Sequence, residues 1–232
     1  MQRYSTGERN LAAAYAFIAG FVDSVGFLFL GGVFLSFMSG NTTRLATATV
    51  EGNTDMALLA GSALSLFLIG VMQGALVRRL AMVALPLHRV REVVMANMCV
   101  IFTLSSVMIL IDQPLAAVLF LSLGIGAMNS IFERGGEVSI PLTYMTGTLV
   151  KMGQRFVDAF FGGTHAAWLS HLKMWAGLTA GAFVGALTYH RMGLNAILVS
   201  TALTLAVSLI AFAFRAHGRR HGTIIRQQAQ PS

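Results

Sequence analysis

The chain has 232 residues, of which 56% are hydrophobic and only 11% are charged, and its mean hydropathy is +0.72. Soluble domains carry roughly 25% charged residues, so this composition excludes an ordinary soluble fold. The net charge of +7 does not indicate nucleic-acid binding, because the Lys and Arg residues stand in the gaps between apolar runs rather than among aromatic residues.

Six apolar runs are long enough to cross a bilayer, which needs about 20 residues per helix. They cover residues 11–30, 56–77, 93–111, 114–132, 172–189 and 192–214. The first run has no small-residue cleavage site, so we expect it to remain in the mature protein. The sequence therefore predicts an all-α polytopic membrane protein of about six transmembrane helices. We expect an N-terminal tail over 1–10, a single membrane domain over 11–214 and a basic C-terminal tail over 215–232.

Basic residues determine the predicted orientation. They gather in the gap over residues 78–91 and in the tail after residue 214, whereas the gap around Asp112 contains none. The positive-inside rule therefore places both termini and the 78–91 gap in the cytoplasm.

Two further apolar segments, over residues 33–50 and 138–150, are interrupted by glycine and hydroxyl residues. If each crossed the membrane fully, the 78–91 gap would move outside and the charge pattern would break. We therefore expect each to be a re-entrant or half-membrane element, in which an extended stretch leads into a short helix. Such backbone is stable at membrane depth only where protein or a water-filled cavity surrounds it.

These two segments resemble each other. FMSGN at residues 37–41 recurs as YMTGT at 144–148, and a basic residue stands four places after each glycine, Arg44 in the first and Lys151 in the second. The match indicates that one segment is a copy of the other.

The flanking sequence extends the match. Asp23 and Asn129 each precede a serine and, further on, a glycine pair, and the pattern G-x-x-x-G-A-L at 70–76 recurs at 181–187. The shared order indicates a duplication, with repeats over residues 11–111 and 114–214. Because each half holds three spans, the halves must be inverted relative to one another, an architecture found in many secondary transporters.

Three stretches carry a resemblance to a known family: AGFVD at residues 19–23, GNTT at 40–43 and YMTGTL at 144–149. With these, the chain is similar to the YoaK family of bacterial multi-pass membrane proteins over most of its length. Ser39 departs from the threonine of the family pattern but keeps the hydroxyl. The resemblance implies a bacterial inner-membrane location and leaves the function open, since the family is a domain of unknown function.

Asp23 is the one acidic residue within the predicted spans. A carboxylate at the centre of a membrane helix costs roughly 2.5 to 3.5 kcal/mol on insertion scales, so it normally faces a cavity or a partner. Asp23 is therefore either a proton-coupling or cation-binding group, or a structural partner of a residue such as Arg44 or Lys151. Its counterpart Asn129 is polar but does not titrate.

The two motifs are typical of half-helix starts, with Ser39, Asn41 or Thr146 as N-caps. If the two N-termini meet near the midplane, their free N–H groups and dipoles would suit an anionic or polar solute. The alternative is a tight turn that only packs the halves together. The candidate solute-binding residues are Asp23, Gly40, Asn41, Thr42, Thr43, Arg44, Asn129, Tyr144, Thr146, Gly147, Thr148 and Lys151.

Other polar and small residues have structural interpretations. Arg44 and Lys151 either neutralise the solute or extend to a membrane interface. The glycine patterns favour close packing between the halves or between protomers of a homo-oligomer, with Gln73 hydrogen-bonding across one of them. His165 and His171 are poorly spaced for a metal, and we expect no metal or cofactor.

The predicted function is secondary transport or facilitated movement of a small polar solute, with anions as one class, across the lipid bilayer. The alternative is a non-transporting scaffold or regulatory subunit that binds partner helices. An enzyme is not expected, because the sequence shows no nucleophile with a base, no metal set and no paired carboxylates.

Overall fold

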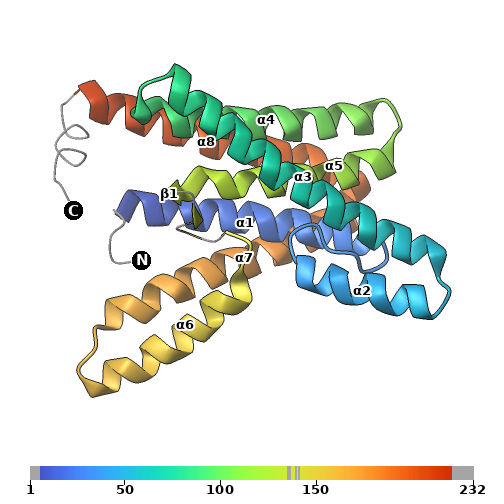
Figure 1. Ribbon diagram of the computed structural model, residues 1–232, viewed down its shortest axis with the longest axis horizontal. Coiled ribbons are helices and arrows are strands. Elements are labelled where there is room, and N and C mark those ends of the chain that lie inside the picture. Colours follow the sequence, from blue (N-terminus) through green and yellow to red (C-terminus); the bar gives the residue numbers. More distant parts are fainter. Residues whose placement is uncertain (1–5, 135–136, 139, 141, 221–232) are drawn as a thin grey trace.

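The structure, a computed structural model, describes residues 6–134, 137, 138, 140 and 142–220 (Figure 1). The α-helices are α1 (Thr6–Phe29), α2 (Met38–Val50), α3 (Thr54–Ala84), α4 (Leu87–Leu110), α5 (Pro114–Met128), α6 (Met145–Asp158), α7 (His165–Met192) and α8 (Ala196–Arg220). Short 3₁₀ turns cover Asn129–Phe132, Ala159–Phe161 and Gly193–Asn195, and strands β1 (Glu133–Arg134) and β2 (Glu137–Val138) pair antiparallel. The predicted all-α class is confirmed.

Length and composition identify five candidate membrane spans, of which the last, His165–His217, covers 53 residues and contains most of α7 and α8. The chain turns between these two helices at Gly193, whose φ of 57° favours glycine. Figure 1 shows α8 running back from this turn, so that the start of α1 and the end of α8 lie at the same end of the molecule.

The helices are longer than the apolar runs that predict them. Arg78 and Arg79 belong to the end of α3, and Arg89 and Arg91 belong to the start of α4, so the gap between the apolar runs over residues 78–91 is mostly helical. Apolar composition marks only the part of a helix that lies in the membrane, whereas backbone hydrogen bonding continues beyond it.

Two helix pairs meet at glycines. A methyl group on Gly70 of α3 would overlap the carbonyl oxygen of Leu123 in α5, and one on Gly181 of α7 would overlap that of Phe17 in α1. Small residues let membrane helices approach this closely. The predicted role of the glycine patterns in helix packing is therefore confirmed within the chain.

The partner helices contribute glycines of their own to the same contacts. Gly20 of α1 lies against the carbonyl of Leu178 in α7, and Gly126 of α5 lies against the carbonyl of Phe67 in α3. Among the helix pairs, α1 with α7 and α3 with α5 make the most extensive contacts. Each crossing therefore has close backbone approach from both sides.

The core lies around α1 and α5. In their apolar windows 61% and 72% of the residues are buried, against 17% for α3, so α3 presents most of its surface outward. Large side chains such as Tyr15, Phe21 and Phe102 are fully buried between α1, α4 and α5 and their neighbours.

Polar side chains join helices inside the apolar core. The Tyr15 and Ser208 hydroxyls lie 2.9 Å apart, and Gln73 and Asn97 exchange amide hydrogen bonds of 2.6 and 3.0 Å. Gln73 thus bonds α4, whereas the glycines beside it face α5, so its predicted bond across the glycine pattern is wrong. Side chains on successive helix positions point in different directions, which sequence spacing alone did not resolve.

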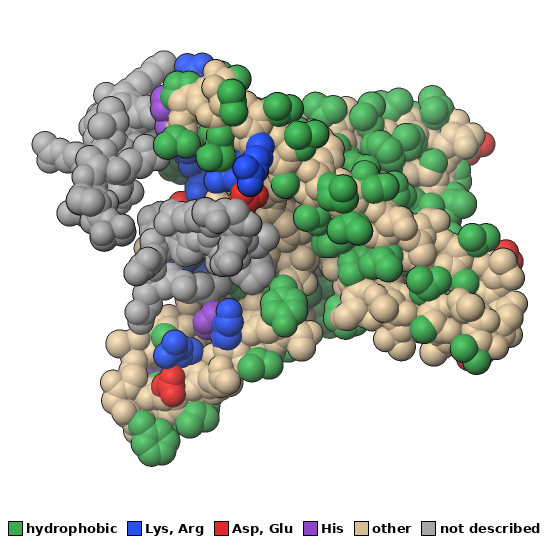
Figure 2. Space-filling model, viewed as in Figure 1, with side chains coloured by type: hydrophobic (Ala, Val, Ile, Leu, Met, Phe, Trp, Pro, Cys, Tyr) green, Lys and Arg blue, Asp and Glu red, His purple; other side chains and the backbone are tan. Residues whose placement is uncertain are grey.

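Basic residues gather toward one end of the molecule. Ion pairs join Arg91 to Glu8 at 3.0 Å and Arg78 to Glu133 at 3.4 Å near the start of α1. On the face shown in Figure 2, Lys and Arg side chains lie toward this end, while the opposite tip shows acidic side chains. The asymmetry agrees with the charge pattern along the sequence.

We predict that Gly70→Ala destabilises the protein. The added methyl group would push against the α5 backbone, and overpacking of this kind costs about 1–3 kcal/mol. The thermal unfolding midpoint of the detergent-solubilised protein should fall by roughly 2–12 °C.

Gly153→Ala is the matched control, since nothing lies within 4 Å of the position of its methyl group and it also sits in a helix. Its midpoint should stay the same or rise slightly, because alanine favours helix more than glycine does. Equal midpoints for the two variants would mean that α3 and α5 are not in close contact.

Candidate functional site

The first candidate element begins where α1 ends. Gly31 and Gly32 have φ values of 64° and 103°, and the Gly32 N–H donates to the carbonyl of Phe27 at 2.7 Å, which closes the helix with a left-handed turn. The chain then runs without regular structure to Phe37, and α2 follows. A non-helical stretch followed by a short helix is the predicted arrangement.

Asp23 fixes this stretch from the preceding helix. Its Oδ1 accepts hydrogen bonds from the N–H groups of Leu35, at 2.7 Å, and Ser36, at 2.9 Å. Its Oδ2 accepts from the Ser36 hydroxyl at 2.9 Å. The carboxylate is thus a structural hydrogen-bond partner, as one of the two sequence interpretations expected, but its partners are Leu35 and Ser36 rather than Arg44 or Lys151. A carboxylate accepts several donors at once, and here free backbone N–H groups occupy it.

Asn41 fixes the same stretch from the first turn of α2. The side chain is fully buried, its Oδ1 accepts from the Phe34 N–H at 2.9 Å, and its Nδ2 donates to the Phe34 carbonyl at 2.6 Å. The amide therefore satisfies both backbone groups of one residue, as a neighbouring strand would. Asn41 was a candidate for binding solute, and its amide already has these two partners within the protein.

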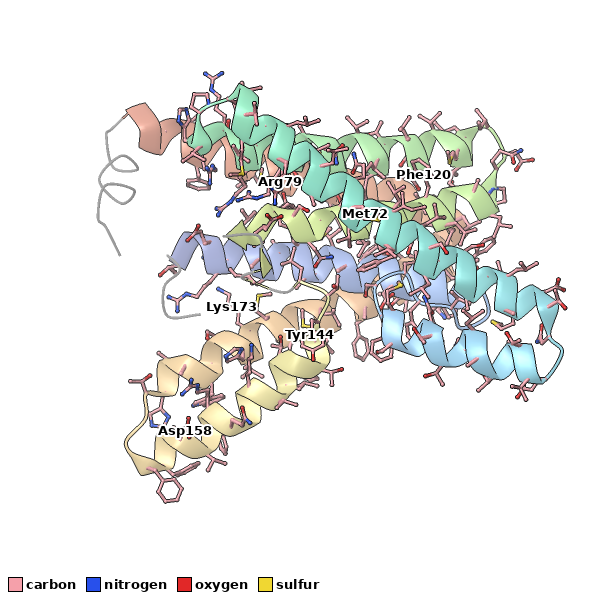
Figure 3. All side chains as sticks on the ribbon, in the orientation of Figure 1. Met72, Arg79, Phe120, Tyr144, Asp158 and Lys173 are labelled. Atoms are coloured by element: carbon pink, nitrogen blue, oxygen red, sulfur yellow. The ribbon has the colours of Figure 1, made fainter. Side chains whose placement is uncertain are left out.

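An aromatic ring covers the glycine of each motif. The ring of Phe37 lies on Gly40 and that of Tyr144 on Gly147, so that a methyl group at either glycine would overlap the ring. Phe37 and Tyr144, which immediately precede α2 and α6, are 40% and 64% exposed. Figure 3 shows Tyr144 at the end of α6 that faces the middle of the molecule.

The predicted N-caps are wrong. The residues at the cap positions are Phe37 and Tyr144, and neither makes a side-chain capping bond. Ser39, Asn41 and Thr146 lie inside the first turn. The helices begin earlier than the hydroxyl residues suggest, and the aromatic residue packs back on the glycine three positions later.

The threonines of both motifs have mostly local roles. Thr42 and Thr43 are exposed, and their hydroxyls donate to the carbonyls of Met38, at 2.9 Å, and Ser39, at 3.3 Å, in their own helix. Thr148 is buried and donates to the Tyr144 carbonyl at 3.2 Å, while Thr146 is exposed. The side chains of Thr42, Thr43 and Thr146 are thus accessible from outside the protein.

The two basic residues have different environments. Arg44 is half-buried, its guanidinium carbon lies 5.9 Å from the centre of the Phe27 ring, and the space for its Nη2 exists because residue 32 is glycine. With the residues that the structure describes, Arg44 forms no ion pair. Lys151 is exposed on α6. Arg44 is therefore a half-buried cation that has no ion-pair partner among the described residues.

The second element repeats part of the first. Asn129 is buried beyond the end of α5, and its Oδ1 accepts from the Thr143 hydroxyl at 3.3 Å. Its Nδ2 donates to the carbonyls of Ile125, at 3.1 Å, and Gly126, at 3.4 Å. Asn129 thus bonds the residue before Tyr144, as Asp23 bonds the residue before Phe37. The predicted glycine pair 135–136 lies outside the described residues.

Sequence reasoning missed several members of these networks. Ser36 and Thr143 stand one position before the matched motifs, and extending the comparison by one residue would have found a hydroxyl in both. Ser122 of α5 donates to the carbonyls of Leu35, at 3.1 Å, and Ala63, at 3.0 Å, and joins the first element to α3. No sequence signal marks Ser122, because its role depends on a contact between distant helices.

A cavity in the described part of the chain is lined by residues outside both motifs. This cavity, of about 420 Å³, lies at the turn between α6 and α7 and is lined by residues that include Arg155, Asp158, Phe161 and Thr164. Figure 3 shows Asp158 at the far end of α6 from Tyr144.

Comparison with known proteins identifies the family. A family model described as a protein of unknown function (DUF1275) matches residues 11–210. The UPF0700 transmembrane protein RA0705 of Rhizobium meliloti strain 1021 is 30% identical over 212 residues, which cover 91% of this chain and 89% of that protein. No solved structure matches the chain. With the long apolar helices, these matches show that the chain is an integral multi-pass membrane protein and belongs to the DUF1275 family.

Proposed function

We propose that this protein is a secondary transporter or facilitator of a small polar solute, with inorganic and carboxylate anions as the favoured class. One observation carries the proposal. The short helices α2 and α6 both begin near the middle of the molecule and run outward to opposite ends (Figure 1). The residue two positions before each helix, Ser36 or Thr143, bonds a polar side chain, Asp23 of α1 or Asn129 just beyond α5. Interrupted helices of this kind form the solute sites of many transporters.

The proposal includes an inverted duplication. Its support is that the helix contacts correspond under exchange of the halves: α1 packs on α7 as α5 packs on α3, with a glycine against a backbone carbonyl at each crossing. In Figure 1 the chain runs through α1 and α5 in opposite directions. Two halves related in this way could expose a central solute to each side in turn.

Arg44 is the proposed charge for an anion. Its guanidinium has a ring contact with Phe27 and no described carboxylate partner, and it lies within two turns of the start of α2. The nearby N–H groups of the first helical turn offer further donors. The exposed hydroxyls of Thr42 and Thr43 donate within α2 and can still accept hydrogen bonds on their outer side. A neutral polar solute would use the same hydroxyls without the charge.

Asp23 is the proposed coupling group. As a carboxylate it accepts three hydrogen bonds from the stretch before α2. Protonation would turn one oxygen into a donor and remove the charge, which weakens this attachment. Proton uptake would thus loosen the first element and open the site.

The proposed setting is a bacterial inner membrane with both termini in the cytoplasm, where the resemblance to the YoaK family also points. The gathering of basic residues toward one end supports this orientation, because such residues favour the cytoplasmic side.

A non-transporting scaffold or regulatory subunit is the second candidate. It is favoured by the complete pairing of Asn41 inside the protein and by the exposed apolar face of α3, where Leu68, Met72 and Leu76 are each more than half exposed. Such a face fits either lipid or a partner helix, and co-purification of a partner in fixed stoichiometry would support the scaffold.

Transport is tested in proteoliposomes with a panel of chloride, formate, phosphate, sulfate, acetate and neutral amino acids. We expect uptake of at least one anion, reduced about 10-fold or more in Arg44→Gln, because a hydrogen bond to a charged group contributes about 1.5–3 kcal/mol. Arg79→Gln, an exposed position at the end of α3, should transport normally. If folded protein moves no member of the panel, the transport proposal is wrong and the scaffold is favoured.

Proton coupling is tested with Asp23→Asn, which keeps an oxygen for the Leu35 and Ser36 N–H groups but does not titrate. We expect uptake by the wild-type protein to increase with an inward proton gradient and uptake by Asp23→Asn to be independent of it. Ser36→Ala, which removes one donor but keeps the carboxylate, should retain the response. A full gradient response in Asp23→Asn would exclude Asp23 as the coupling group.

Asn41→Ala should destabilise the fold. It leaves the N–H and carbonyl of Phe34 without their partner, and each unsatisfied buried group costs about 1–3 kcal/mol. The unfolding midpoint in detergent should fall by roughly 4 °C or more. Thr42→Ala, which removes only an exposed hydroxyl bonded within its own helix, should leave the midpoint unchanged. A stable Asn41→Ala protein would show that the amide does not hold the stretch before α2.

A further inference from the structure

The hairpin formed by α6 and the first turn of α7, here called the α6–α7 hairpin (residues 145–168), extends away from the helix bundle (Figure 1). Within the described residues, α6 makes its extensive contacts with α7 and with the 3₁₀ turn Ala159–Phe161 that follows it. Much of its surface therefore faces neither the core nor another helix.

One side of the hairpin is apolar and aromatic. Val157, Phe160 and Phe161 are 53%, 70% and 86% exposed, and they lie toward its tip. Phe156 packs edge-on against Phe160 at 5.2 Å and against Trp168 of α7 at 5.3 Å between ring centres. A rigid aromatic cluster at the end of a projecting hairpin is costly to leave in water and suits the boundary between headgroups and acyl chains.

The other side is cationic. Lys151 and Arg155 are one turn apart on α6 and both are exposed. The Arg155 guanidinium lies 3.1 Å from Asp158, in a pair whose side chains are more than half exposed and so add little stability. Arg155 also lines the cavity of about 420 Å³ at the turn, beside Thr164. Asp158 lines the same cavity, so the hairpin places a cation, a hydroxyl and a carboxylate around a space large enough for a headgroup, and a bound phosphate would replace Asp158 as the partner of Arg155.

The hairpin points toward the basic end of the molecule. Figure 2 shows its Lys and Arg side chains on the same end as those of α3 and α4. The leaflet that meets such an end is the cytoplasmic one, whose anionic lipids attract each nearby Lys or Arg by about 1 kcal/mol. Aromatic and basic sides together match an anionic phospholipid better than they match a neutral one.

The matching hairpin at the other end lacks these features. Around its circumference, α2 carries hydroxyl residues with Arg44 as its one cation, and the α2–α3 turn at Glu51, Gly52 and Asn53 has no aromatic side chain. A general need of half-membrane helices for lipid contact would have given both hairpins the same composition. The difference indicates a role for the α6–α7 hairpin alone.

We propose that the α6–α7 hairpin is a binding site for an anionic phospholipid, whose phosphate is held by Arg155 and Lys151 while Phe160 and Phe161 insert beside its acyl chains. The site is separate from the transport proposal and does not depend on it. A soluble acidic partner would use the same cations but would not need the aromatic tip in the bilayer.

The test uses the full chain in a neutral detergent, titrated with phosphatidylglycerol or phosphatidylcholine, with bound lipid counted by native mass spectrometry. We expect tighter binding of phosphatidylglycerol. In the double variant Lys151→Gln, Arg155→Gln, the affinity for phosphatidylglycerol should fall about fivefold per cation removed, because each cation contributes about 1 kcal/mol to binding. The matched control, Arg79→Gln with Arg89→Gln, removes the same charge from the same end but outside the hairpin, and its affinity should fall less than that of the hairpin variant.

A second variant separates the two sides of the site. Phe160→Ser with Phe161→Ser should weaken the binding of both lipids about equally, and because both side chains are exposed, its unfolding midpoint should not change. Three outcomes would overturn the proposal: equal affinity of wild-type protein for the two lipids, unchanged phosphatidylglycerol affinity in the charge variant, or an equal loss in the control. If the charge variant loses affinity for an acidic peptide but keeps its affinity for phosphatidylglycerol, the hairpin binds a soluble partner and the lipid proposal is wrong.

Discussion

The architecture depends on satisfying backbone polar groups where the chain leaves helical structure between long membrane helices. Backbone N–H and carbonyl groups at such a place have no water to bond if they lie in the hydrocarbon, so the protein must supply partners. Asp23, Asn41 and Ser122 do this for Phe34, Leu35 and Ser36. With these bonds the stretch before α2 has one conformation, and α2 begins at a fixed place and direction.

Close helix crossings connect the two ends of the molecule. Asp23 and Gly20 belong to α1, and Gly20 lies against the backbone of α7, the helix on which α6 packs. A movement of α1 would therefore displace both short helices. It would act on α2 through the Asp23 hydrogen bonds and on α6 through the backbone contact with α7. Glycine crossings leave little freedom for sliding, because no flexible side chain lies between the two backbones.

The parts predictable from sequence are those set by composition and local pattern. Long apolar runs predicted the major helices, and the FMSGN and YMTGT motifs located both short helices. The helix starts, the Gln73 partner and the role of Ser122 were not predictable, because each depends on which helix lies opposite. The ring of Phe37 packs on Gly40 at the start of α2, and the hydroxyl residues nearby gave the wrong cap. Asp23 shows the same limit. Its position in an apolar run predicts a polar partner, but only the fold shows that the partners include the backbone N–H groups of Leu35 and Ser36.

Differences between the matched elements are as informative as their likeness. Asp23 accepts three hydrogen bonds from the stretch before α2, whereas Asn129 accepts one, from Thr143, among the described residues. Asn41 bonds back to that stretch, while its counterpart Thr148 bonds within its own helix. Among the described residues, the first element is thus held by a carboxylate that protonation can neutralise, and the second by fewer hydrogen bonds, all from neutral side chains. If the proposed transport opens the two elements in turn, this difference favours control at the first, because, in the part of the chain that the structure describes, only there does a titratable side chain hold the stretch before the short helix.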